Sequence, residues 1–311
     1  MLVDRWGFMQ TIKRGINVSG FGDWAENNPL FKDEYFKIIK TAGFDHVRLP
    51  FYFGSRHGIN VSDEYFAVVR KVVAMARKYG MVAIVDMHGF VNMDEQPMKY
   101  RDDFIAAWRV IAEKLQDMDE NVWFEIINEP HENFGAALLN DFQNAAIAEI
   151  RKTNPDRMIV AACAHYNTAE NLKFLQLPQD ENIIVTLHNY TPMSVTHQGA
   201  EWCSDKYPTG VKWYGTDSEI EQLRKTFDLA AEWSKENNCK LWLGEFGVYD
   251  KGDLESRVRW TEIVVKMCEE RDIAWAYWEF GCGFGAYDIQ KGCWKEPLIN
   301  ALLPGPVEVG A

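Results

Sequence analysis

Short runs of apolar residues alternate along the chain with longer segments whose apolar positions recur at helical spacing. Most of the runs are apolar nearly throughout, as in Ile183-Ile184-Val185-Thr186-Leu187, which is typical of strands buried on both faces of a parallel sheet. The pattern predicts eight strands, at residues 13–18, 46–50, 82–88, 122–129, 158–164, 183–190, 241–247 and 273–280. Helices are predicted between them at residues 33–42, 64–79, 100–115, 136–152 and 254–270.

Local signals add a sixth helix and two helix ends. Ser218, followed three residues later by Glu221, has the form of a capping box and predicts a helix whose apolar positions run to Trp233. Gly43 and Gly80 are expected to end two other helices, because glycine readily adopts the left-handed conformation found there.

The strict alternation of strand and helix predicts an α/β protein. Eight such units in 311 residues fit one closed (β/α)8 barrel, the TIM-barrel architecture. No linker rich in Pro, Gly or Ser divides the chain, so we expect residues 1–311 to form a single barrel domain. An open, doubly wound sheet is the alternative. It would need a glycine-rich phosphate turn after the first strand, and Gly20-Phe21-Gly22-Asp23 lacks the remaining glycine.

Composition and charge exclude some classes of protein and of binding partner. The chain is 47% hydrophobic and 25% charged, which excludes a disordered protein. Its net charge of −13 argues against nucleic acid or an anionic membrane surface as a partner. Because no long apolar run and no signal-like start is present, we expect a soluble protein, extracellular if a signal was removed and otherwise cytoplasmic. We expect a monomer.

Chemically useful residues recur where the predicted strands end, which is where a barrel builds its functional face. They are Arg48, His88, Asn128, Glu129, His188, Tyr190, Glu245 and Trp278. The carboxylates Glu129 and Glu245 follow the fourth and seventh strands and can point into one cleft. Such a pair suits glycosidic-bond cleavage, because one carboxyl donates a proton to the leaving oxygen while the other attacks the anomeric carbon or activates water.

Some acidic residues at the strand ends are expected to have structural roles. A lone acidic residue at a strand end most often forms a salt bridge, and we expect this of Asp86, Glu125 and Glu279. Glu129 and Glu245 differ, because burying two carboxyls among an arginine, a tyrosine and two histidines costs several kcal/mol unless function maintains it. The histidines and the six scattered cysteines lack metal-ligand spacing, so no metal and no cofactor is expected.

The eight strand-end residues, in this order, resemble glycoside hydrolase family 5, also called cellulase family A. Residues 14–17 and 196–202 are also similar to its bacterial endo-β-1,4-glucanase branch. One departure is Gly89, where many relatives carry a second histidine. The resemblance implies a retaining double displacement with Glu129 as acid/base and Glu245 as nucleophile.

The same resemblance implies roles for the surrounding residues. Arg48 and Tyr190 match positions that contact the nucleophile, and His188 matches the residue beside the acid/base. Asn128 would hold the sugar 2-hydroxyl. The remaining implied substrate contacts are Asn17 and His88 to other hydroxyls, Trp278 as an apolar floor, and His197 and Trp202 in the long connection between residues 191 and 217.

The sequence therefore predicts a retaining endo-β-1,4-glucanase acting on β-1,4-linked polysaccharides such as cellulose and β-glucan. The alternative is an endo-β-1,4-mannanase or a dual enzyme that also accepts glucomannan, because glucan and mannan differ at the 2-hydroxyl. A non-hydrolytic carbohydrate-binding barrel is the alternative from a different class. We would expect such a protein to have lost one of the two carboxylates, and this chain has both.

Overall fold

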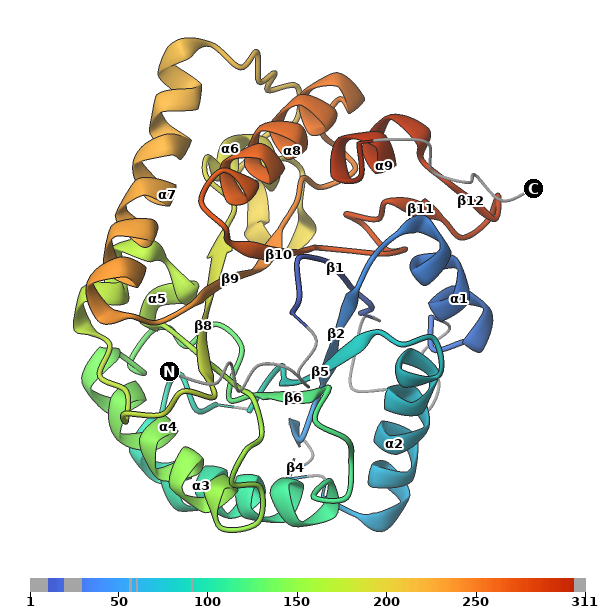
Figure 1. The fold of residues 1–311 in the computed structure, drawn as a ribbon. Helices are drawn as coiled ribbons and strands as arrows, with labels where there is room; N and C mark the ends of the chain where they lie inside the picture. Colours follow the sequence, from blue (N-terminus) through green and yellow to red (C-terminus); the bar gives the residue numbers. More distant parts are fainter. Residues whose placement is uncertain (1–10, 20–29, 56–57, 60, 91, 305–311) are drawn as a thin grey trace, which may run out of the picture.

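The computed structural model describes residues 11–19, 30–55, 58–59, 61–90 and 92–304. Eight parallel strands close into a barrel in the order β1-β10-β9-β8-β7-β6-β5-β2, with helices around the outside (Figure 1). The barrel strands are β1 (Arg14–Asn17), β2 (His46–Phe51), β5 (Val82–Met87), β6 (Val122–Glu125), β7 (Ile159–Ala161), β8 (Ile183–Asn189), β9 (Leu241–Phe246) and β10 (Ala274–Tyr277).

This closed barrel confirms the predicted fold, since each predicted strand contains one observed barrel strand apart from residue 51 of β2. The open doubly wound sheet is wrong, because β1 pairs with both β2 and β10 and leaves no sheet edge. The glycine pattern at residues 20–23 lies outside the described residues.

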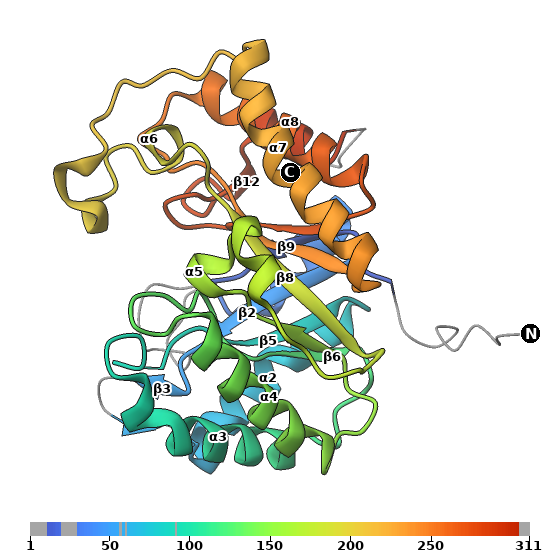
Figure 2. The same ribbon diagram turned by 90° about the vertical axis from the view of Figure 1, so that its left-hand side faces the viewer.

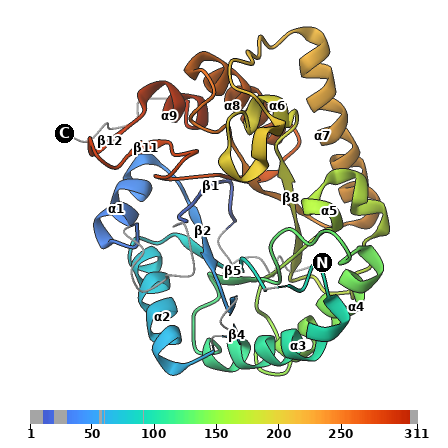
Figure 3. The ribbon, with the colours of Figure 1, turned by 180° about the vertical axis from the view of Figure 1, so that it is seen from behind.

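The principal helices surround the strands, as the view from behind also shows (Figure 3). They are α1 (Asp33–Ala42), α2 (Asp63–Lys78), α3 (Pro97–Lys114), α4 (Ala136–Arg151), α7 (Asp217–Asn237), α8 (Leu254–Glu269) and α9 (Glu296–Leu302). Short elements fill the connections: the hairpins β3 (Gly54–Ser55) with β4 (Gly58–Ile59) and β11 (Tyr287–Asp288) with β12 (Cys293–Trp294), the helices α5 (Ala164–Asn167) and α6 (Met193–Thr196), and the 3-10 helices η3 (Ala169–Phe174) and η4 (Glu201–Lys206).

One helix start differs from the prediction. The capping box of α7 is formed by Thr216 and Glu219, not by Ser218 and Glu221: Thr216 Oγ1 accepts from the Glu219 amide, and Glu219 Oε2 accepts from the Thr216 amide at 2.8 Å. Thr216 has the extended backbone of an N-cap, whereas Ser218 already lies within the helix. Gly43, at φ 113°, ends α1 as expected, and Gly80, at φ 69°, follows the end of α2.

Strand alternation separates an inner core from an outer one. Val82 and Ile84 point into the barrel, where they meet side chains such as Trp123 and Trp242. Ala83 and Val85 point outward into the larger core beneath the helices. Both faces are therefore buried, which explains the nearly continuous apolar runs. The next inward position of β5 after Ile84 is Asp86, so the barrel interior becomes polar at the carboxyl end of the strands.

A bulge in β9 places a glutamate on this polar inner face. Leu187 pairs with Leu243, but the next residue of β8, His188, pairs with Glu245, so Gly244 is an extra residue. Without it, Glu245 would point to the outer face. A Cβ atom on Gly244 would collide with the Thr186 hydroxyl, so only glycine fits there.

The connection after β8, which carries α6 and η4, extends outward from the barrel (yellow in Figure 2). In the described part of the chain, no helix is both long and apolar enough to span a bilayer.

Candidate active site

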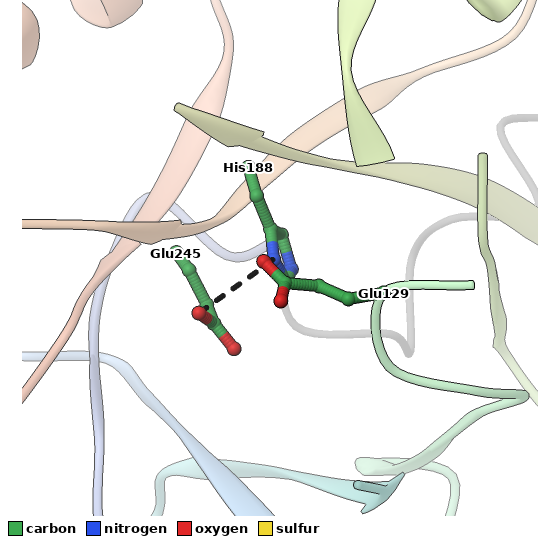
Figure 4. A group of neighbouring side chains, drawn as sticks. All are labelled: Glu129, His188 and Glu245. Carbon is green, nitrogen blue, oxygen red and sulfur yellow. Dashed lines mark hydrogen bonds and ion pairs between the residues drawn. The ribbon is translucent and has the colours of Figure 1, made fainter. Parts of the chain in front are cut away.

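The carboxyl ends of the strands bring together the two glutamates that the sequence singled out. Glu245 lies on β9, His188 on β8 and Glu129 on the connection after β6, and their side chains converge (Figure 4). One carboxylate oxygen of Glu129 and one of Glu245 lie within 4.8 Å of each other. A retaining glycosidase holds its carboxyl groups about 5 to 5.5 Å apart, whereas an inverting one needs about 6.5 to 9.5 Å. The observed spacing fits the retaining geometry.

Glu245 has a donor on each of its oxygens. Arg48 Nη1 donates to Oε1 at 2.5 Å, and the Tyr190 hydroxyl donates to Oε2 at 2.9 Å. Nδ1 of His188 lies 3.6 Å from the same Oε2. Two donors directed at both oxygens match a carboxylate, because a carboxylic acid would direct a hydrogen of its own at one of them.

Glu129 has a different environment. Nδ1 of His188 lies 2.8 Å from its Oε1, and a quarter of its side-chain surface stays exposed. Burial raises the pKa of Glu129 above its ordinary value, against the opposing effect of nearby basic side chains, among them His88 and Arg48. The two glutamates thus have different surroundings, since an arginine and a tyrosine hold Glu245 whereas a histidine faces Glu129.

Arg48 is the centre of the charge network beneath this pair. Its fully buried guanidinium donates to both oxygens of Glu125, at 2.7 and 2.9 Å, and lies 3.0 Å from Asp86 Oδ2. Burial raises the pKa of Asp86 and of Glu125 to about 7 in each case, although Arg48 opposes the shift. These contacts confirm that Asp86 and Glu125 are salt-bridge partners. The same expectation for Glu279 is wrong, because among the described residues it accepts a hydrogen bond from Ser19 instead of pairing with a cation.

Asn17 lies behind the cleft. Its side chain is fully buried, Nδ2 donates to the backbone oxygens of Gly244 at 2.9 Å and Tyr277 at 3.2 Å, and Oδ1 accepts from Arg48 at 3.1 Å. With these contacts Asn17 orients Arg48 and is not placed to hold a sugar hydroxyl, which differs from the role expected for it.

Three other predicted residues lie after the barrel strands β5, β6 and β10: His88, Asn128 and Trp278. Asn128 Oδ1 accepts from Arg48 at 2.8 Å, which leaves its amide nitrogen as a donor. The His88 ring stacks on Trp278 with centroids 5.4 Å apart, and its Nδ1 lies 2.7 Å from Asp86 Oδ2. Burial lowers the pKa of His88 to about 4, which favours the neutral imidazole.

A row of aromatic rings begins at Tyr190, which contacts Glu245. Tyr190 packs edge-on against His197 at 4.8 Å, and His197 packs against Trp202 at 6.2 Å. Trp202 is 53% exposed, whereas Trp213 of the same connection is buried. Exposed indole beside a row of rings is a surface on which a sugar can stack.

Residues on the turn after β7 also contact the site, although no sequence pattern predicted them. Tyr166 stacks on His131 at 4.5 Å, and His131 Nδ1 lies 2.7 Å from the backbone oxygen of Glu129. Asn167 is fully buried, with Nδ2 3.3 Å from Nε2 of His188. The strand β7 has only three residues and no distinctive residue ends it, so no sequence pattern pointed to this turn.

Glu129, His188 and Glu245 are also close enough to surround a metal ion. Their potential ligand atoms are already used: Arg48 and Tyr190 occupy Glu245, and His188 Nδ1 faces Glu129. A cation bound to Glu245 would stand beside the Arg48 guanidinium. The arrangement therefore does not fit a metal site.

Comparison with known proteins gives concordant matches. The family model "Cellulase (glycosyl hydrolase family 5)" matches residues 9–282. Endoglucanase H of Acetivibrio thermocellus is 28% identical over 98% of the chain, which spans only 33% of that protein's length. A solved hyperthermophilic endo-β-1,4-glucanase in complex with substrate is 39% identical, with a TM-score of 0.90 over 94% of this chain and 97% of that one. Cel5A of Thermotoga maritima, solved with mannotriose, is 36% identical, with a TM-score of 0.87 over 94% of this chain and 97% of that one.

Proposed function

Because the chain belongs to the cellulase family, glycosyl hydrolase family 5, we propose that it is a retaining endo-β-1,4-glucanase that cleaves internal bonds of β-1,4-linked glucans. The observation that carries the proposal is the closely spaced pair Glu129 and Glu245, in which one carboxyl is half-buried beside a histidine and the other is held by an arginine and a tyrosine. Glu129 is the acid/base and Glu245 the nucleophile.

In the first step an oxygen of Glu245 attacks the anomeric carbon, and the glycosidic C–O bond breaks. Glu129 gives its proton to the departing oxygen, which leaves as the hydroxyl of the released chain. The raised pKa of Glu129 supports this role, because it keeps more of the group protonated. Arg48 and Tyr190 hold the attacking carboxylate in place.

In the second step water attacks the same carbon and displaces Glu245 from the glycosyl-enzyme. Glu129, now a carboxylate, takes a proton from that water and returns to its starting state. The hydrogen bond between His188 and Glu129 Oε1 stabilises the carboxylate between the two steps.

The surrounding residues bind the sugars. The amide nitrogen of Asn128, which has no hydrogen-bond partner among the described residues, is the donor for the 2-hydroxyl of the sugar under attack, and His88 binds a neighbouring hydroxyl. The stacked Trp278 supplies an apolar face beneath that sugar, and His197 with Trp202 continues the contact along the chain. Arg48 and Asn17 act from behind this surface.

Activity on mannan is the second candidate. The mannotriose complex of the related Thermotoga maritima protein favours it, since that cleft admits a manno-configured sugar. In this chain the discriminating contact would be Asn128, because glucose and mannose differ in the orientation of the 2-hydroxyl.

Initial rates of reducing-end release from carboxymethylcellulose, barley β-glucan, glucomannan and unsubstituted mannan test the proposal. Glu245→Gln is the blank, because the amide keeps the shape of the side chain but is a poor nucleophile. We expect the parent protein to hydrolyse the glucans and the Glu245→Gln variant not to do so. The rate on mannan relative to the glucans measures how far the enzyme accepts both polymers. If the parent protein binds these polymers but hydrolyses none of them, it is a carbohydrate-binding barrel instead.

A further inference from the structure

The turn after β7 has an unusual backbone that ends beside the active site. His165, Tyr166 and Asn167 all have positive φ angles, at 52°, 61° and 57°. Such a run is rare outside glycine, and asparagine is among the residues that tolerate it best. The Tyr166 amide donates to the backbone oxygen of Pro130 at 3.2 Å, which ties the turn to the segment that carries Glu129.

Hydrogen bonds fix the orientation of the Asn167 amide. The Cys163 backbone N–H lies 2.8 Å from Oδ1 of Asn167. A backbone N–H can only donate, so the atom that faces it must be the carbonyl oxygen and not the NH2 group. The NH2 group of this fully buried side chain then faces Nε2 of His188 at 3.3 Å.

This orientation determines where His188 carries its proton. An amide NH2 has no acceptor, so Nε2 of His188 must be the acceptor and the single ring proton sits on Nδ1. Nδ1 lies 2.8 Å from Oε1 of Glu129. An imidazolium is disfavoured as well, because its Nε2–H would point at the NH2 group of Asn167.

Charged groups face His188 from several elements. Glu129 and Glu245 are near Nδ1, at 2.8 and 3.6 Å, and both favour a protonated ring. The Arg48 guanidinium opposes it, and His88 does so only where its own ring is charged. Burial is the largest influence and lowers the pKa of His188 to about 3, in agreement with the neutral ring that the amide geometry requires.

We propose that Asn167 is a positioning residue that holds His188 as the neutral Nδ1–H tautomer, so that His188 always donates to Glu129 and never takes its proton. This deepens the proposed function and rests on Glu129 as the acid/base. A histidine with a bare Nδ1 would compete for the proton that Glu129 must deliver to the leaving oxygen. A doubly protonated histidine would make Glu129 too weak a base to activate water.

The tautomer can be read directly, without activity. Long-range 1H–15N correlation spectra of protein labelled at the histidine nitrogens distinguish the two tautomers, since the protonated nitrogen and the bare one resonate far apart. The His188 signals are those lost in His188→Gln. We expect Nδ1 protonated and Nε2 bare across the active pH range. A bare Nδ1, or a doubly protonated ring near neutral pH, would overturn the proposal.

Two variants keep the left-handed turn accessible while changing the contact. Asn167→Asp places an acceptor opposite Nε2, beside a ring whose Nδ1–H already faces Glu129, so we expect the spectrum to show both ring nitrogens protonated, which makes His188 a cation. The alkaline limb of kcat/KM should then move down by about one pH unit, because a cationic neighbour lowers a carboxyl pKa and the new aspartate offsets part of that effect. Asn167→Gly removes the donor, and we expect mixed tautomers and a kcat/KM about tenfold lower. His165→Asn is the matched control on the same turn, and both readouts should stay unchanged.

Circular dichroism confirms that each variant folds. If Asn167→Asp keeps both the spectrum and the pH limb of the parent, Asn167 does not set the tautomer. If the spectra behave as expected but no polysaccharide is hydrolysed, the tautomer proposal stands and the proposed function fails.

Discussion

Arg48 and Glu245 form a 2.5 Å ion pair between β2 and β9, two strands that are not neighbours in the barrel. The guanidinium is fully buried and also contacts Asp86 and Glu125. A lone buried cation would be strongly destabilising, so these carboxylates compensate the charge that Arg48 needs to hold Glu245.

Arg48→Lys should separate geometry from charge. Lysine keeps the charge but lacks the planar fork that contacts three carboxylates at once. We expect kcat/KM to fall by at least about 100-fold, since the position of the Glu245 carboxylate depends on that fork. The free energy of unfolding should fall by about 3 kcal/mol, because buried carboxylates lose their partner. Arg101→Lys, which changes an exposed pair with Asp141, is the control and should alter neither quantity appreciably. Full activity in Arg48→Lys would show that the fork does not position Glu245.

The pH dependence of kcat/KM should be bell-shaped. Activity falls on the acid side as Glu245 gains a proton and on the alkaline side as Glu129 loses one. Because burial raises the pKa of Glu129, the alkaline limb should lie above the ordinary glutamate value. The control is Glu129→Gln with an aryl cellobioside whose leaving group needs no proton. The rate at which this variant forms the glycosyl-enzyme should show no alkaline limb. A profile that stays flat from about pH 3 to 9 would contradict a mechanism with two carboxylates.

Glu279→Gln should show how much a buried carboxylate outside the Glu129–Glu245 pair lowers the free energy of unfolding. Burial raises the pKa of Glu279 to about 7, against donors that include Ser19. Because the pKa of Glu279 is higher in the folded state than in the unfolded state, the protonated group stabilises the fold below about pH 4.5. This contribution to the free energy of unfolding, about 3 kcal/mol in total, is lost as the pH rises through about 7. The neutral amide carries no such loss, so the variant should gain stability relative to the parent between pH 5 and 8. Parallel urea titrations at these two pH values measure the difference, and a difference independent of pH would mean that Glu279 stays ionised when folded.

Trp202→Ala tests the outer end of the row of rings. Trp202 is 53% exposed and contributes little to the core, so thermal stability should hardly change. Loss of one stacked sugar should lower kcat/KM on polysaccharide by about tenfold, with a smaller effect on short oligosaccharides. Tyr214→Ala is the matched control, since Tyr214 is 66% exposed on the same connection but lies outside the row. Equal losses in both variants would argue against a specific sugar contact at Trp202.

The sequence predicted those parts of the fold that depend on local patterns, and it did not predict those that depend on the backbone geometry of a particular residue. Strand positions could be predicted because both faces are buried, so apolar runs such as that of β8 mark them directly. The start of α7 could not be placed to the residue, because two capping pairs lie two positions apart and only the backbone of Thr216 decides between them.

The site was predicted where a strand end carries a distinctive side chain, as at His188 or Glu245. It was not predicted where the decisive feature is local backbone geometry. The β9 bulge that turns Glu245 inward depends on a pairing with β8 that the sequence does not display. Asn167 reaches His188 only through three consecutive left-handed residues, and Asn17 is withdrawn from the cleft by hydrogen bonds to distant strands.

The assignment of Glu245 as nucleophile and Glu129 as acid/base is tested most directly by azide rescue with a dinitrophenyl β-cellobioside. In Glu245→Ala, azide should replace the missing carboxylate, attack the anomeric carbon from the opposite face and give the α-glycosyl azide. In Glu129→Ala, Glu245 still forms the glycosyl-enzyme, and azide should then displace it to give the β-glycosyl azide. NMR of the anomeric proton distinguishes the two products. The predicted result is α from Glu245→Ala and β from Glu129→Ala, and the reverse pattern, or hydrolysis that persists undiminished in Glu245→Ala, would contradict the assignment.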